Sequence, residues 1–211
     1  ILSLLGENGS GKTTLMNMIA GIYFPDEGHI YVRGQEAVIR SPRDAFDLGI
    51  GMIHQHFKLV DVFSAAENIV LGLDEKGRYD IRKVAQRVRE ISERYGFDID
   101  PNKKIHEMSV SEKQTVEIVK VLYRGADILI LDEPTRGIDV GTKVDIQKLV
   151  LKLASEGMSV TFISSETDEM LRTCSRLIVM RDRRVVGELS GEDLTQTKIM
   201  STIAGGESKH E

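Results

Sequence analysis

The chain contains a single cysteine, Cys174, among its 211 residues, so no internal disulfide can form and a reducing compartment is expected. No apolar run approaches the roughly 18 residues that would span a bilayer. No signal peptide is visible. The sequence also lacks an initiating methionine and opens inside an apolar run, residues 1–5. We therefore expect that residues upstream of Ile1 are missing.

An excess of basic residues is also lacking. The net charge of -5 argues against an unaided nucleic-acid binder, which would usually carry a basic face, so no nucleic acid is expected as a partner. Hydrophobic residues make up 41% and charged residues 29%, which is an ordinary balance for a globular domain. The length suits one large domain or a domain with a subdomain.

Strand-like and helix-like segments alternate along most of the chain, which predicts an α/β fold with a mainly parallel sheet covered by helices. The expected strands are 1–5, 29–33, 50–53, 127–132, 158–164, 176–181 and 184–188. Between Gln55 and Arg124 no convincing strand occurs, and residues 80–95 and 109–123 have the pattern of helices. We therefore expect a helical subdomain, 56–123, inserted into a core made of residues 1–55 and 124–211.

Residues 6–13 read GENGSGKT and follow an apolar strand-like run. They match G-x-x-x-x-G-K-[ST], a loop that binds nucleotide phosphates. Its glycines let the backbone approach phosphate oxygens closely, and amide groups converge on the anion at the start of the next helix. Lys12 would reach the β- and γ-phosphates, and the Thr13 hydroxyl would ligate Mg²⁺. The candidate binding residues are Gly6, Glu7, Asn8, Gly9, Ser10, Gly11, Lys12, Thr13 and Thr14. The alternative is a chance glycine-rich turn.

Residues 128–133 read ILILDE, and four apolar residues in a row predict a strand buried on both faces. Asp132 and Glu133 follow at its carboxyl end, where α/β folds place their ligands. Asp132 could hold Mg²⁺ through water, and Glu133 could polarise an attacking water as a general base. The alternative is a strand that runs into an acidic turn.

With this phosphate loop upstream, DEPTRGIDVG (132–141) resembles the nucleotide-binding subunit of ABC transporters. GMIHQHFKLVDVFSAAENIVLGL (51–73) is similar to the family's glutamine loop, and VTFISSETDEM (160–170) looks like the importers of simple sugars and nucleosides. The resemblance implies a P-loop NTPase fold with a RecA-like core. It also implies N-terminal strands and an adenine-stacking aromatic residue upstream of Ile1, and hence weak ATP binding by this chain.

The resemblance assigns roles by position. Gln55 matches the glutamine loop that senses Mg²⁺ and the γ-phosphate, so Glu133 and Gln55 are the expected catalytic residues, and the expected metal ligands are Thr13, Gln55 and Asp132. Asp139 matches the D-loop aspartate that reaches a partner cassette. The signature motif, which contacts the partner's ATP, falls on Ser109, Val110, Ser111 and Glu112.

Two motifs depart from the family pattern. The usual signature is Leu-Ser-Gly-Gly-Gln, and here only Ser109 is retained. Ser111 adds a Cβ where the backbone should approach a phosphate closely, and we expect strain of about 1–3 kcal/mol there. Ser165 occupies the position of the switch histidine. Hydrolysis by the isolated chain is therefore expected to be slow.

The resemblance implies an ATPase that drives an importer of a simple sugar or nucleoside, with ATP and Mg²⁺ as cofactors. Its expected partners are a second cassette and membrane permease subunits, and its expected location is the cytoplasmic face of the inner membrane. A membrane contact is expected along residues 56–63. The alternative is a degenerate regulatory cassette. The DEPT sequence argues against the class of small-molecule P-loop kinases. A DNA-repair ATPase of the same superfamily would need a long coiled-coil insertion, and the helical segment is too short for one.

Three features are interpreted as structural. His54 and His56 flank Gln55 but have no third metal ligand nearby, so ordinary loop histidines are favoured over a metal pair. RDRR (181–184) is typical of a solvated turn between two strands. Cys174 is interpreted as a small buried residue and not as a nucleophile.

Overall fold

The main sheet has six strands in the order β4-β5-β6-β1-β7-β8. The computed structural model describes residues 1–54, 57–73 and 80–205. The first five strands in this order are parallel, and β8 runs antiparallel to β7. The strands are β1 (Leu2–Leu5), β4 (Ile50–Ile53), β5 (Ile128–Asp132), β6 (Ser159–Ile163), β7 (Arg176–Arg181) and β8 (Arg184–Ser190). The mixed, mainly parallel sheet confirms the predicted α/β class.

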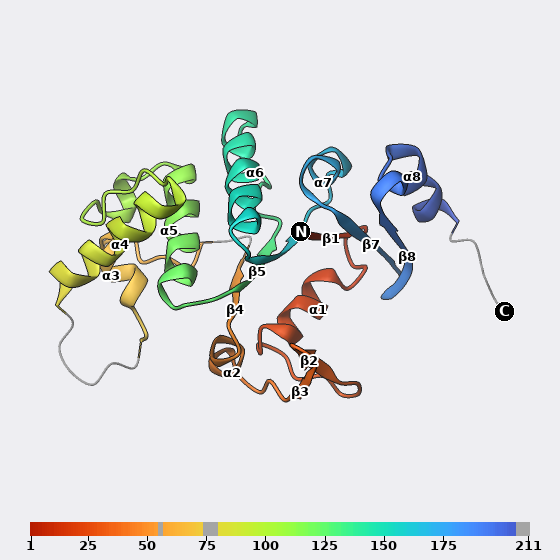
Figure 1. Ribbon diagram of the computed structural model, residues 1–211, viewed down its shortest axis with the longest axis horizontal. Helices are drawn as coiled ribbons and strands as arrows, with labels where there is room; N and C mark the ends of the chain where they lie inside the picture. The colour runs from red at the N-terminus through yellow and green to blue at the C-terminus, as the bar shows by residue number, and fades with distance from the viewer. Residues whose placement is uncertain (55–56, 74–79, 206–211) are drawn as a thin grey trace.

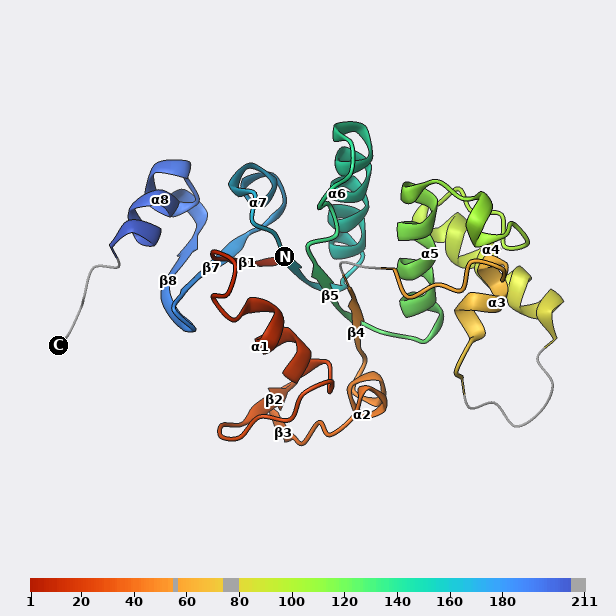
Figure 2. The same ribbon diagram turned by 180° about the vertical axis from the view of Figure 1, so that it is seen from behind.

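Helices cover both faces of this sheet (Figures 1 and 2). On one face lie α1 (Lys12–Ile19) and α2 (Pro42–Asp47), and on the other α6 (Val140–Ser155) and α7 (Thr167–Thr173), with α8 (Gln196–Ala204) near the C-terminal end. Successive residues of a strand point to opposite faces, so Leu129 and Leu131 pack with α6 while Ile130 packs with Met16 of α1. The central strand β5 is therefore buried on both faces, as its apolar run predicted.

The predicted helical segment contains α3 (Ala65–Val70), α4 (Ile81–Tyr95), the 3₁₀ turn η1 (Ile105–Glu107) and α5 (Val110–Tyr123). In the ribbon it lies at the end of the molecule away from α8 (Figure 1). Val84, Val88 and Ile91 recur at helical spacing on α4 and pack with α5 in a cluster of their own. Within 57–73 and 80–123 no strand forms, and no described helix is long and apolar enough to cross a bilayer. The boundaries of a separate subdomain stay a prediction.

A second, two-stranded sheet consists of β2 (Ile30–Val32) and β3 (Gln35–Ala37), paired antiparallel. The sequence predicted a strand at β2 and missed β3, because Gln35-Glu36-Ala37 is short, polar and mostly exposed. Arg33 and Gly34 form the turn with φ angles of 51° and 77°. Two successive residues with positive φ are typical of the tight turns that join hairpin strands.

Candidate functional site

The loop between β1 and α1 carries the predicted phosphate-binding sequence. Helix α1 begins at Lys12 directly after Gly11, whose φ of 94° lies in the left-handed region that glycine favours. A Cβ at Gly6 would come within 2.4 Å of the Met180 carbonyl oxygen, so only glycine fits where the loop leaves β1. No side chain caps the first turn of α1. Its amide groups therefore remain available to an anion.

Lys12 lies within this loop and is only 5% exposed. Its Nζ donates to the carbonyl oxygens of Gly6 at 2.6 Å and Glu7 at 3.0 Å. Burial lowers the pKa of the Lys12 ammonium, and the negative charges of Glu133 and Asp132 oppose this effect. The structure thus places a buried cation between the phosphate loop and the two carboxylates at the end of β5.

The Thr13 hydroxyl donates a hydrogen bond of 3.3 Å to Oδ1 of Asp132, 119 residues further along the chain. Burial raises the pKa of the Asp132 carboxyl, and the bond from Thr13 opposes the rise. A hydroxyl and a carboxylate are hard oxygen donors of the kind that Mg²⁺ takes, usually with water and phosphate oxygens as further ligands. Among the described residues, no group of three or more His, Cys, Asp or Glu side chains is placed to hold a metal ion by itself. The pair therefore fits an Mg²⁺ ion that is shared with a ligand's phosphates.

Glu133 follows directly after β5 and is 9% exposed. Its φ of 47° is unusual for a residue other than glycine and costs on the order of 1 kcal/mol. Its N–H donates to the carbonyl oxygen of Ile163 at 3.0 Å, which extends the pairing of β5 with β6. Its carboxylate Oε2 accepts from Nη1 of Arg136 at 2.8 Å. Glu133 is thus held at both its backbone and its side chain.

A cavity of about 870 Å³ lies against these residues, bounded by the phosphate loop, the segment after β5 and the β7–β8 hairpin. Asn8, Gly9, Gly11, Lys12, Thr13, Thr14 and Glu133 from the predicted site line it. Leu15, Met18, Met180 and Val185 supply apolar wall, and none of the described lining residues is aromatic. The cavity therefore combines a phosphate-binding side with an apolar side, as a nucleotide requires.

Two arginines of the cavity wall, Arg136 and Arg183, were not assigned to the site from the sequence. Arg136 was visible only as part of DEPTRG. The interpretation of 181–184 as a turn between two strands is confirmed, since Asp182 and Arg183 connect β7 to β8 with φ angles of 50° and 63°. Because β7 runs parallel to β1, this turn reaches the phosphate loop, which the local charge pattern could not reveal.

The predicted signature residues form the start of α5. Ser109 caps the helix: its Oγ accepts from the Glu112 N–H at 3.2 Å, and Oε2 of Glu112 accepts from the Ser109 N–H at 2.8 Å. Val110 and Ser111 occupy the first helical turn, and neither has a positive φ. The first turn of α5 therefore accommodates the Cβ of Ser111 without a left-handed backbone. The strain expected where Ser111 approaches a partner's phosphate stays a prediction.

Glu112 also forms an ion pair with Lys103, whose Nζ lies 2.6 Å from Oε1. This hydrogen bond from Lys103, together with the one from the Ser109 N–H, lowers the pKa of the Glu112 carboxyl. The Glu112 carboxylate thus already accepts from the Ser109 N–H at the start of the helix, where an anion would otherwise bind. None of the four signature residues lines the phosphate cavity of its own chain. Their contact with a partner's ATP stays a prediction.

Asp139 and Ser165 both lie near the carboxyl edge of the sheet. Asp139 caps α6, with its carboxylate accepting from the N–H and the hydroxyl of Thr142 at 3.0 and 2.7 Å. These bonds lower the pKa of Asp139. Ser165 is exposed after β6. Its neighbour Ser164 donates to buried Glu169 at 2.8 Å. The roles assigned to Asp139 and Ser165 toward a second cassette or a phosphate remain predictions.

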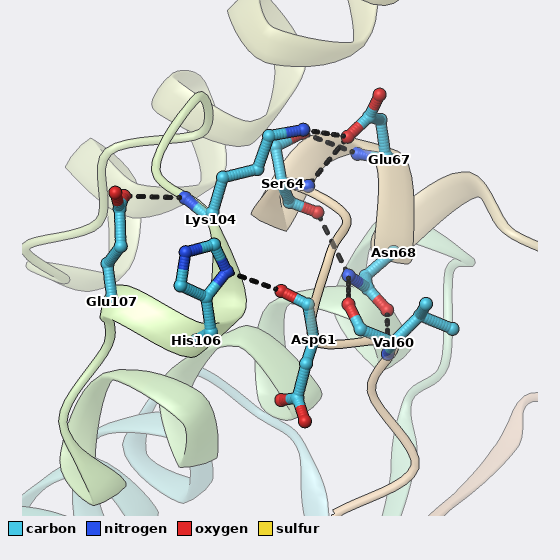
Figure 3. A network of polar contacts seen from close by, with 8 residues as sticks. All are labelled: Val60, Asp61, Ser64, Glu67, Asn68, Lys104, His106 and Glu107. Carbon is cyan, nitrogen blue, oxygen red and sulfur yellow. Dashed lines mark hydrogen bonds and ion pairs between the residues drawn. The ribbon is translucent and has the colours of Figure 1, made fainter.

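The described part of the predicted membrane-contact loop, residues 57–63, is tied to the helical segment (Figure 3). Asn68, fully buried on α3, accepts from the Val60 N–H at 2.7 Å and donates to the Val60 carbonyl at 3.1 Å. The backbone N–H of His106 donates to the Asp61 carbonyl at 3.1 Å. Residues 57–63 therefore hold a defined shape, whatever they contact.

Some predicted positions have no structural account. Gln55, the expected catalytic residue and third metal ligand, and His56 lie outside the described residues.

Two residues that the sequence analysis interpreted as structural, His54 and Cys174, are described. The pKa of His54 is lowered by burial and by the charge of Lys58. Burial raises the pKa of the half-buried Cys174 thiol, which suits the interpretation of Cys174 as a packing residue.

A glycine-rich phosphate loop that faces buried Asp132 and Glu133 at the carboxyl edge of a mainly parallel sheet defines a nucleotide-binding α/β protein. The profile of the ABC transporter family matches residues 1–136. The chain therefore belongs to the ABC transporter family, and its fold is that of an ATP-binding cassette.

Curated relatives extend the match over nearly the whole chain. The guanosine import ATP-binding protein NupO of Bacillus subtilis (strain 168) is 45% identical over 98% of this chain and 41% of its own length. The nucleoside import ATP-binding protein NupA of Lactococcus lactis subsp. cremoris (strain MG1363) is 41% identical over 97% of this chain and 41% of its own. The chain thus spans less than half the length of these relatives.

Solved structures agree on the fold. The ADP conformation of MJ1267, an ATP-binding cassette of an ABC transporter, superimposes with a TM-score of 0.83 at 24% identity over 97% of this chain and 87% of that one. The dimeric cassette MJ0796, in a post-hydrolysis state bound to ADP and Pi, gives a TM-score of 0.74 at 25% identity over 90% of this chain and 84% of that one.

Proposed function

We propose that this chain is the ATP-binding and hydrolysing part of an ABC importer for a nucleoside or a simple sugar. The observation that carries the proposal is the 3.3 Å hydrogen bond from Thr13 to Asp132, which joins the end of the phosphate loop to the end of β5 beside Lys12 and Glu133. The names of NupO and NupA support nucleoside import as the first cargo to test.

Different residues of the chain would bind the phosphates, hold Mg²⁺ and accept the proton. The amides of the phosphate loop and Lys12 would bind the phosphates, and Thr13 with Asp132 would hold Mg²⁺. Bound Mg²⁺ would neutralise charge that develops on the phosphate oxygens. Glu133 would accept a proton from the attacking water, a role for which its place on the cavity wall suits it. The apolar side chains of the cavity would exclude water around the base.

A second cassette and membrane permease subunits are the proposed partners. The dimeric structure of the similar cassette MJ0796 supports pairing of two cassettes. Residues 57–63, fixed to the helical segment by Asn68, are the proposed contact with a permease. Such contacts would place the chain at the cytoplasmic face of the membrane. The division into a RecA-like core and a helical subdomain belongs to the same proposal.

Removal of the Lys12 ammonium tests nucleotide binding directly. We expect Lys12→Ala to weaken binding of ATP with Mg²⁺ at least about tenfold, because a charge-assisted contact contributes roughly 1.5–3 kcal/mol. Isothermal titration calorimetry measures the change. Lys148→Ala, which removes a 73% exposed lysine side chain outside the cavity, is the control and should bind ATP as the wild type does. Equal affinities in all three proteins would sink the assignment.

The degenerate regulatory cassette remains a second candidate function. It is favoured by the Glu112 carboxylate, which already accepts from the Ser109 N–H and pairs with Lys103 at the start of α5. A negative charge at that place opposes the approach of a partner's phosphate. The two candidates share ATP binding and differ in turnover.

A further inference from the structure

Three cationic side chains line the phosphate cavity in the described chain: those of Lys12, Arg136 and Arg183. Lys12, the proposed phosphate-binding lysine, lies inside the loop, where its Nζ donates to the carbonyl oxygens of Gly6 and Glu7. Asp132 and Glu133 bring two negative charges to the same region. A triphosphate entering the cavity would add several more, so a further positive charge beside its distal end, in addition to Lys12 and Mg²⁺, would favour binding.

Arg136 is placed to supply that charge. Its backbone N–H donates to the Glu133 carbonyl at 3.2 Å, which closes a tight turn, and its Nη1 lies 2.8 Å from Oε2 of Glu133. The Arg136 side chain is 52% exposed while that of Glu133 is 10% exposed. A guanidinium has five N–H donors, and this contact uses one of them. The remaining donors belong to a side chain that lines the cavity.

The neighbouring strand offers no such charge. After β6 come the neutral hydroxyls of Ser164 and Ser165. The nearby ammonium of Lys143 forms ion pairs with Glu166 and, at 3.2 Å, with the buried carboxylate of Glu169. Lys143 is thus held away from the cavity by two carboxylates. Among the described residues, Arg136 is the cation that both contacts Glu133, the proposed general base, and lines the cavity.

We propose that Arg136 is a further residue of the nucleotide site, and that its guanidinium bridges the Glu133 carboxylate and the γ-phosphate of ATP bound by the same chain. The planar fork of arginine can bond a carboxylate and a phosphate together, which a point charge such as lysine does less well. The bridge offsets the repulsion between Glu133 and the γ-phosphate. This inference rests on the proposed function of the cavity as an ATP site.

A structural ion pair would behave differently. An exposed pair three residues apart in sequence contributes little to stability, and its loss would leave nucleotide binding unchanged. A bridge to the γ-phosphate would instead make Arg136 strengthen the binding of ATP but not of ADP, because ADP lacks the phosphate that Arg136 would contact. The ratio of the two affinities therefore distinguishes the two roles.

The experiment is a titration, in the presence of Mg²⁺, with ADP and with the non-hydrolysable β,γ-imido analogue of ATP. We expect Arg136→Ala to weaken the analogue about tenfold and ADP less than twofold. Arg136→Lys should fall between the alanine variant and the wild type, because it keeps the charge and loses the fork. Arg87→Ala is the matched control, since it removes the arginine of another Arg–Glu pair three residues apart, with Glu90 at 3.2 Å, away from the phosphate cavity. It should leave the ratio of the two affinities unchanged.

Equal losses for both nucleotides in Arg136→Ala, or no loss for either, would overturn the proposal. A lowered melting temperature with an unchanged ratio would also overturn it, and would assign Arg136 to holding Glu133 in place. Lys12→Ala run beside these variants separates the two claims. If Lys12→Ala binds both nucleotides as the wild type does, the proposed function of the cavity fails. If Lys12→Ala weakens nucleotide binding as expected and only the Arg136 result is negative, the bridge alone fails.

Discussion

Asp132 and Glu133 are neighbours in sequence that the fold uses in different ways. Asp132 ends β5 and accepts from Thr13, while Glu133 turns to a positive φ and pairs with Arg136. The change in backbone direction sends one carboxylate to the proposed metal site and the other to the cavity wall. A strained φ next to buried charges is typical of sites where function is favoured over stability.

Asp132 gives a pH-dependent prediction at this scale. Its folded pKa lies above its unfolded value, near 3.8, because of burial. The proton thus binds more tightly to the folded state, so the stabilisation is full below the unfolded pKa and is lost as the pH rises through the folded pKa. At neutral pH the buried charge opposes folding. We expect Asp132→Asn to stabilise the fold at pH 7 by about 1 kcal/mol, as functional-site replacements often do.

Thermal unfolding across a pH series measures this effect. The advantage of Asp132→Asn should shrink as the pH is lowered through the folded pKa, because the wild-type carboxyl is then protonated too. Asp145→Asn, in which the replaced carboxylate is 69% exposed, should show no comparable change. An advantage of Asp132→Asn that does not vary with pH would show that burial of the charge is not its source.

At the scale of elements, a single side chain of α3 determines the path of the loop before it. Asn68 is fully buried and satisfies both the N–H and the carbonyl of Val60, and it also donates to the Ser64 carbonyl at 3.0 Å. Because buried backbone groups must be paired, these bonds fix residues 57–63 against the helical segment (Figure 3). The proposed permease contact therefore depends on a residue that no permease would touch.

We expect Asn68→Ala to lower the free energy of unfolding by about 1–3 kcal/mol, because it removes the hydrogen bonds of a fully buried side chain to the half-buried N–H and carbonyl of Val60. Urea denaturation followed by circular dichroism is the measurement. Gln86→Ala, on the exposed face of α4, is the control and should change stability by less than about 0.5 kcal/mol. Asn68→Ala with the stability of the Gln86 variant would mean that the loop is held by other contacts.

At the scale of the whole molecule, two copies of this chain would repeat every departure from the family pattern. Each phosphate loop would face an α5 terminus that carries Glu112, and each site would have Ser165 where a histidine is usual. We expect slow phosphate release by the chain alone, reduced on the order of 10²–10³ by analogy with the loss of a transition-state donor. The residual turnover should depend on Glu133, the proposed base.

The contribution of Glu112 can be isolated within the same assay. We expect Glu112→Gln to raise turnover at saturating ATP, because glutamine keeps the capping contacts and removes the negative charge. Glu107→Gln, in which the carboxylate accepts from the Lys104 N–H at 3.4 Å in the adjacent turn, is the control and should not raise it. Fast, Glu133-dependent turnover by the unaltered chain would eliminate the regulatory alternative.

The sequence by itself determined the phosphate loop, the Asp132–Glu133 pair and nearly every strand, because these depend on local rules. Glycines at fixed spacing, an apolar run before two carboxylates and a 3.6-residue period have the same meaning wherever they occur. The helical conformation of Ser111 also follows from a local rule, the capping box of Ser109 and Glu112 at the start of α5. The strain expected at Ser111 concerns the approach of a partner's phosphate and stays a prediction.

Only the tertiary structure decided which distant residues meet. Parallel strands deliver their carboxyl ends to one edge, so Thr13 reaches Asp132 across 119 residues and the β7–β8 turn brings Arg183 to the phosphate loop. Strand β3 forms because its partner β2 and the Arg33–Gly34 turn impose it on a polar sequence. Arg136 lies in the site because β5 and β1 end at the same edge of the sheet, which brings the segment after β5 to the phosphate loop. A local sequence pattern cannot predict this, because the cavity and its charges are formed by segments far apart in the chain.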